Sequence, residues 1–111
     1  MKYALLIYGR GDAYEALTEE QTKAIYAGHD AFAAKVGGAI QSGAELQPPP
    51  TATTVRPQAG EHLITDGPFS EAAEQLGGFY LVEARDLDEA IEFAKQLPML
   101  PTDAVEVRPL M

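Results

Sequence analysis

The strongest constraint on the fold comes from two short segments that are apolar on both faces of a strand. Tyr3 to Tyr8 is continuously apolar and stops at a glycine-rich turn, and Phe79 to Ala84 has the same character except at Glu83. Successive side chains of a strand point to opposite faces, so both faces of these strands need an apolar partner. We therefore expect a sheet whose two apolar strands are covered on both sides.

The first of these strands is followed by a clear helix signal. Thr18 and Gln21 have the spacing of a capping box, and the helix is expected to run to about Val36, where Gly37-Gly38 ends it. Four residues are spaced so that they share one face of this helix, and we expect that face to pack against the core: Ile25, His29, Phe32 and Val36.

The second apolar strand is also followed by a helix signal. Asp86 begins a cap-like pattern, and the helix is expected over Leu87 to Leu97, before Pro98. Ser70 to Leu76, which lies between a serine cap and Gly77-Gly78, is expected to form a further brief helix. The remaining strands are expected over Ala39 to Leu46, Thr51 to Arg56, His62 to Thr65 and Ala104 to Val107.

This order of elements predicts a single α+β domain over residues 1–111. Two β-α-β halves surround an inserted hairpin, which is the ferredoxin-like arrangement. Right-handed crossovers place both helices on one face of an antiparallel sheet. The other face would remain a large apolar surface, so we expect a homodimer in which two sheets face each other.

The charge and composition exclude several classes of protein. The formal net charge is -9, with eight Lys and Arg residues, which disfavours nucleic acid and anionic membrane surfaces as partners. The absence of cysteine excludes disulfides and thiolate chemistry. The apolar run at the N-terminus is too short for a signal peptide or a membrane span, and a cytoplasmic location is expected.

The most conspicuous local motif is Asp66-Gly67-Pro68-Phe69. Gly67 and Pro68 predict a rigid turn, and Phe69 would either anchor that loop or face a ligand. Asp66 would act as a general base or as a hydrogen-bond acceptor for a substrate. The structural alternative is that its carboxylate binds the backbone N–H groups of its own turn.

Other candidate site residues lie on the first strand, the first helix and the second apolar strand. His29 would shuttle a proton with Asp66, or would be a core histidine bonded to backbone. Tyr8, Arg10 and Tyr80 would line a pocket, where the arginine could hold an anion, although tyrosines at strand ends also serve ordinary packing. No ligand spacing such as His-x-x-x-His occurs, so neither a metal site nor a cofactor is expected.

Several motifs in this order resemble the YCII-related proteins, in the subgroup named for its Asp-Gly-Pro-Phe motif. The matching stretches are Lys2-Tyr3-Ala4-Leu5-Leu6-Ile7-Tyr8, Leu46-Gln47-Pro48, Thr53-Thr54-Val55-Arg56, Thr65-Asp66-Gly67-Pro68-Phe69, the segment from Gly77 to Ala90, and Val105-Glu106-Val107-Arg108-Pro109. The resemblance implies a dimeric α/β barrel and a cytoplasmic bacterial protein of a mostly uncharacterised family. It also implies a His and Asp pair, with the histidine in the first helix. Counting back from Gly43, Tyr26 occupies that place, one turn before His29.

Three functions follow as hypotheses. The first is a homodimeric domain that binds a small molecule near the Asp-Gly-Pro-Phe loop. The second is a small cofactor-independent lyase or isomerase in which Asp66, with His29, moves a proton. The third is a regulatory partner that acts by protein contact, because the resemblance implies an association with sigma-factor genes.

Overall fold

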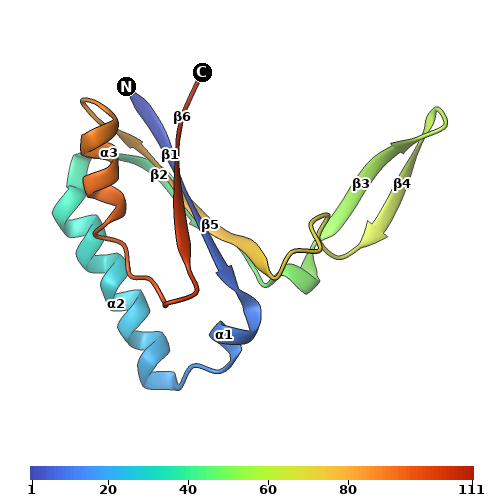
Figure 1. The fold of residues 1–111 in the computed structure, drawn as a ribbon, viewed down its shortest axis with the longest axis horizontal. Helices are drawn as coiled ribbons and strands as arrows, with labels where there is room; N and C mark the ends of the chain where they lie inside the picture. The colour runs from blue at the N-terminus through green and yellow to red at the C-terminus, as the bar shows by residue number, and fades with distance from the viewer.

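The computed structural model describes residues 1–111 and combines a four-stranded sheet with a two-stranded hairpin (Figure 1). In chain order the helices and strands are β1 (Lys2–Arg10), α1 (Gly11–Glu15), α2 (Glu19–Val36), β2 (Ile40–Glu45), β3 (Thr53–Gln58), β4 (Glu61–Asp66), β5 (Glu74–Glu83), α3 (Leu87–Ala94) and β6 (Ala104–Pro109). Short 3₁₀ turns occupy Gly37–Ala39 and Pro49–Thr51. None of the helices combines the length and the apolar character needed to span a membrane.

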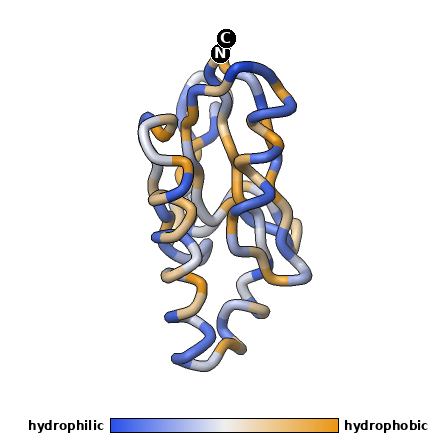
Figure 2. The backbone as a smooth tube through the Cα atoms, turned by 90° about the vertical axis from the view of Figure 1, so that its left-hand side faces the viewer, coloured by the Kyte–Doolittle hydropathy of each residue, from blue (hydrophilic) through white to orange (hydrophobic).

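The main sheet has the strand order β2-β5-β1-β6, and each neighbouring pair is antiparallel. This is the order expected when two β-α-β units interleave, so the predicted α+β, ferredoxin-like fold is confirmed. The N- and C-termini lie side by side at one end of the molecule (Figures 1 and 2). There the N–H of Leu110 donates to the carbonyl of Lys2 at 2.9 Å.

The core lies between the helices and one face of the sheet. It contains Tyr3, Leu5 and Val82 from the sheet, Phe32 from α2 and Ala90 from α3, all almost fully buried. The predicted stripe on α2 is confirmed, since Phe32 is buried and its three companions are half-buried. Only nine of the 111 residues are buried in all, so this core is small and the chain leaves much apolar surface uncovered.

The caps form as the sequence predicts. Thr18 Oγ1 accepts from the Gln21 N–H at 3.1 Å, and the Thr18 N–H donates to Gln21 Oε1 at 2.8 Å, which completes the capping box of α2. At α3 the Asp86 carboxylate caps the helix by accepting from the Glu89 N–H at 2.9 Å, and the Glu89 carboxylate accepts from the Arg85 N–H at 2.9 Å. However, α3 ends at Ala94 and not at Leu97, because the chain tightens into i→i+3 turns before the following proline.

The helix predicted over Ser70 to Leu76 is wrong. The chain enters β5 at Glu74, and Gln75 and Leu76 pair with Gly9 and Tyr8 of β1. Gly77-Gly78, expected to stop a helix, lie inside the strand. Pairing with β1 completes a sheet ladder, and this outweighs the weak local helix signal.

The face of the sheet that points away from the helices is open, and it is apolar on β1 and β5, whereas β6 contributes the ion pair of Glu106 and Arg108 to it. Ala4 pairs with Leu81 and Leu6 pairs with Phe79 on this face, and all four remain half-buried. The hairpin of β3 and β4 extends away from the sheet on the side opposite α2 (Figure 1). As a result the radius of gyration is 15.8 Å, compared with about 13 Å for a compact chain of this length.

Candidate functional site

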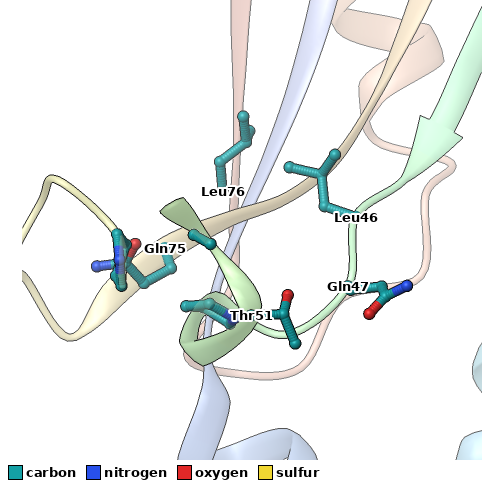
Figure 3. Close-up of a pocket in the computed structure, with 8 residues that line it drawn as sticks. Leu46, Gln47, Thr51, Gln75 and Leu76 are labelled. Carbon is teal, nitrogen blue, oxygen red and sulfur yellow. The ribbon is translucent and has the colours of Figure 1, made fainter. Parts of the chain in front are cut away.

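A depression of about 340 Å³ lies where the hairpin joins the sheet. Its lining residues are Leu46, Gln47, Pro49, Thr51, Ala52, Pro68, Gln75 and Leu76. In Figure 3 the side chains of Leu46 and Leu76 project to the same side, and Gln47 and Thr51 come from the connection that leads to the hairpin. The depression therefore has an apolar part and a neutral polar part, and Pro68 places it beside the Asp-Gly-Pro-Phe loop. We call it the loop pocket.

Gly67 fixes the shape of this loop. Its φ of 95° lies in the left-handed region, where glycine meets no steric penalty. The Gly67 N–H donates to the carbonyl of Ala52 at 2.7 Å, and its own carbonyl accepts from Thr54 Oγ1 at 2.7 Å. The predicted turn is thus confirmed, and its hydrogen bonds tie the end of β4 to the start of β3.

Asp66 and Phe69 flank this turn on the surface. Asp66 closes β4 opposite Thr53, and its exposed carboxylate has no hydrogen-bond partner within the chain. The backbone of Gly67, and not the carboxylate of Asp66, holds the turn. Phe69 is 69% exposed, and the Arg56 guanidinium lies 5.2 Å from the centre of its ring.

His29 and Tyr80 meet on the helix side of the sheet. His29 Nδ1 lies 2.8 Å from the Tyr80 hydroxyl, and the Tyr80 ring also packs against Phe32 with 4.8 Å between ring centres. Partial burial lowers the pKa of His29, although the Glu45 and Asp30 carboxylates oppose that shift. His29 is therefore bonded to a side chain and not to backbone.

Tyr8 and Arg10 occupy the far end of β1. Tyr8 is half-buried and pairs with Leu76, a lining residue of the loop pocket. Arg10 donates twice to the Asp12 carboxylate, from Nε at 3.1 Å and from Nη2 at 3.0 Å. The hydrogen bonds to Arg10 lower the pKa of Asp12. The Arg10 guanidinium therefore binds the carboxylate of Asp12, two residues along the chain.

Comparison with known proteins identifies the family. The family model described as the YCII-related domain matches residues 1–111. This chain belongs to the YCII-related family. An uncharacterized protein of Rhizobium meliloti (strain 1021) is similar to it, with 39% identity over 114 residues that cover 99% of this chain and 92% of the relative.

In this YCII-related chain the residues predicted to form a site fall into separate places. Asp66, Gly67, Pro68 and Phe69 lie at the base of the hairpin, with Tyr8 on the neighbouring part of the sheet. His29 and Tyr80 lie on the helix side, and Figure 1 places α2 and β4 on opposite sides of the sheet. The fold of this chain therefore does not bring His29 and Asp66 together.

Sequence reasoning missed a second group of polar residues on the helix side of the YCII-related fold. The Tyr26 hydroxyl lies 3.0 Å from both carboxylate oxygens of Glu45, and the Tyr14 hydroxyl donates to Asp103 Oδ2 at 2.6 Å. The hydrogen bond to Glu45 raises the pKa of Tyr26, and burial together with Asp103 raises that of Tyr14. The only signal in the sequence was the spacing from Gly43, which puts Tyr26 at the place where the family resemblance implies a histidine.

The YCII-related chain has no set of side chains arranged for metal binding. No three His, Asp or Glu residues come close enough to share one ion.

Proposed function

We propose that this YCII-related domain acts as a homodimer that binds a small molecule in the loop pocket. The observation that carries this proposal is the open depression of about 340 Å³ beside Pro68, on a chain whose sheet face is left uncovered. Its volume falls in the range of about 300–1,000 Å³ typical of small-molecule sites. The Asp-Gly-Pro-Phe motif at 66–69 also favours membership of the subgroup named for it.

The chemistry of the lining supports a neutral ligand with both apolar and hydrogen-bonding parts. None of the lining residues carries a charge. The Gln75 side chain donates from Nε2 to the carbonyls of Ser70 and Ala72, which fixes its orientation and leaves Oε1 available as an acceptor. Leu46 and Leu76 supply the apolar contacts.

The exposed area supports a second copy. The chain exposes 7619 Å² at a mass of 11.9 kDa, compared with about 5,900 Å² for a compact monomer of that mass. The difference of about 1,700 Å² exceeds the roughly 800 Å² that each partner buries in a standard interface. The apolar sheet face with Leu6 and Phe79 is the natural surface for that contact, and it would produce the dimeric α/β barrel.

The hairpin supports the same assembly. A two-stranded hairpin is only marginally stable by itself in water. Here Val55 and Ile64 of the hairpin are 60% and 67% exposed and pair directly with each other. A second copy that covers the sheet face would also shield this arm and close the open side of the loop pocket.

A second function has one observation in its favour. The Asp66 carboxylate is exposed, without a partner, and lies two residues before the pocket residue Pro68. It would thus be free to take a proton in a lyase or isomerase. Its proposed helper His29 belongs to α2, which lies on the other side of the sheet from β4 (Figure 1), so ligand binding remains the first proposal.

Sedimentation and a thermal-shift ligand screen test the proposal together. Wild type should sediment as a dimer, and Leu6→Arg as a folded monomer, because the arginine puts a charge on the apolar face and Glu106, directly opposite on β6, can bind it together with Arg108. A monomeric wild type would refute the dimer. If the wild-type dimer still exposes a large apolar surface, the hypothesis of a regulatory partner that acts by protein contact would be favoured instead.

The ligand screen uses a pair of matched variants. Gln47→Trp fills the loop pocket, whereas Gln58→Trp places the same ring at the exposed end of the hairpin. A ligand of the pocket should stabilise wild type and Gln58→Trp but not Gln47→Trp. If no compound separates these variants, the pocket proposal fails. Loss of turnover in Asp66→Asn with ligand binding retained would support the enzyme instead.

A further inference from the structure

A second cavity of about 200 Å³ lies on the helix side, between α1, the first turns of α2 and the end of β2. Its lining residues are Tyr14, Leu17, Thr22, Ile25, Tyr26 and Glu45, none of which lines the loop pocket. We propose that this cavity binds a small organic ammonium ion.

The first argument is an unpaired carboxylate. Glu45 is exposed and accepts from the Tyr26 hydroxyl, it takes part in none of the ion pairs of the chain, and no lysine or arginine lines the cavity. Its negative charge acts on the surrounding phenols, and it contributes to the raised pKa values of Tyr14, Tyr26 and Tyr80. A cation bound in this cavity would be attracted by the Glu45 carboxylate and would meet no competing side-chain cation among the lining residues.

The second argument is the aromatic lining. The faces of tyrosine rings attract cations, and pockets for quaternary ammonium ions are built from such rings. Tyr14 and Tyr26 contribute two rings that are 38% and 51% exposed. Both rings are already held in place, Tyr26 by Glu45 and Tyr14 by Asp103, whose carboxylate also accepts from the Leu100 N–H at 2.9 Å. Such preorganisation lowers the entropy cost of binding.

The remaining lining residues select among cations. Leu17 and Ile25 provide an apolar wall for methyl or methylene groups. A hard metal ion needs several oxygen ligands, whereas Glu45 is the only carboxylate that lines this cavity. The volume lies below the range of about 300–1,000 Å³ for drug-sized ligands, which indicates a small ion.

Titration calorimetry with choline tests the proposal, and 3,3-dimethylbutan-1-ol serves as its neutral carbon analogue. Wild type should bind choline and should not bind the analogue. Glu45→Gln keeps the size of the side chain and an acceptor for Tyr26 but removes the charge, and it should weaken choline binding at least about tenfold. Glu61→Gln makes the same change at the far end of the hairpin and should leave binding unchanged.

A second pair of variants separates the ring from its hydroxyl. Tyr26→Phe keeps the aromatic face and should retain most of the affinity, whereas Tyr26→Leu should lose it. Thermal melts of each variant establish that the protein is folded.

Equal binding of the neutral analogue, equal affinity in Glu45→Gln, or no heat with millimolar choline would each overturn the proposal. Because the two cavities share no residue, failure here leaves the loop pocket untouched, and the Gln47→Trp variant tests that pocket separately.

Discussion

Replacement of Gly43 by alanine tests how tightly the helix-side residues are packed. A Cβ atom built at Gly43 would lie 2.8 Å from the Phe79 carbonyl oxygen and 2.8 Å from Cδ1 of Tyr80. Neither neighbour yields easily, because the first is backbone and the second is a ring held between Phe32 and His29. The strand β2 must therefore shift relative to β5.

The expected size of the effect follows from two opposing terms. Overpacking of this kind costs about 1–3 kcal/mol, and the lower entropy of the unfolded alanine chain offsets roughly 0.5–1 kcal/mol. The net loss is about 1 kcal/mol at the middle of these ranges and at most about 2.5 kcal/mol, which corresponds to a fall in Tm of about 5 °C and at most about 10 °C. Because β2 is an edge strand that can move, a complete loss of folding is not expected.

Thermal unfolding followed by circular dichroism measures this change at fixed protein concentration, since self-association would make Tm depend on concentration. Gly38→Ala is the matched control, because a Cβ there meets no atom within 4 Å and the backbone φ is not positive. It should leave Tm unchanged or raise it slightly. If Gly43→Ala and Gly38→Ala have the same Tm, Tyr80 does not approach β2 as closely as the structure indicates.

Two further predictions concern α2. Thr18→Ala removes one half of the capping box and should lower the free energy of unfolding by about 1 kcal/mol in a urea titration, whereas Thr22→Ala, one turn later, should have a smaller effect because it is not the cap. A loss for Thr22→Ala as large as that for Thr18→Ala would contradict the capping argument. The pKa of His29 is lower in the folded protein than its value of about 6.5 in the unfolded chain, so the unfolded chain binds a proton more readily. The free energy of unfolding therefore decreases as the pH falls below about 6.5. His29→Gln should therefore reduce the fall in Tm between neutral and mildly acidic pH, and an unchanged pH profile would show that His29 does not titrate in this way.

Much of the fold was predictable because its signals are local. The capping box at Thr18, the cap at Asp86 and the positive φ that Gly67 supplies all involve residues within a few positions of one another. The apolar residues of Tyr3 to Tyr8 also predicted an apolar surface on the side of the sheet away from the helices. The open face around Leu6 confirms that surface.

The arrangement of the candidate site was not predictable in the same way. His29 and Tyr80 are 51 residues apart in sequence, and Tyr14 and Asp103 are 89 apart, so their contacts depend on how the strands align. Whether His29 and Asp66 face each other also depended on the tertiary structure, and in this chain the hairpin carries Asp66, at the end of β4, away from α2 (Figure 1).

The sequence by itself determined the caps, the apolar strands and the turn at Gly67, because backbone conformation and side-chain alternation are properties of neighbouring residues. The tertiary structure alone decided that Gln75 and Leu76 continue a strand and that Tyr26 meets Glu45. Those outcomes depend on which distant segments pair in the sheet, and the free energy of that pairing exceeds the local preferences of the segments involved.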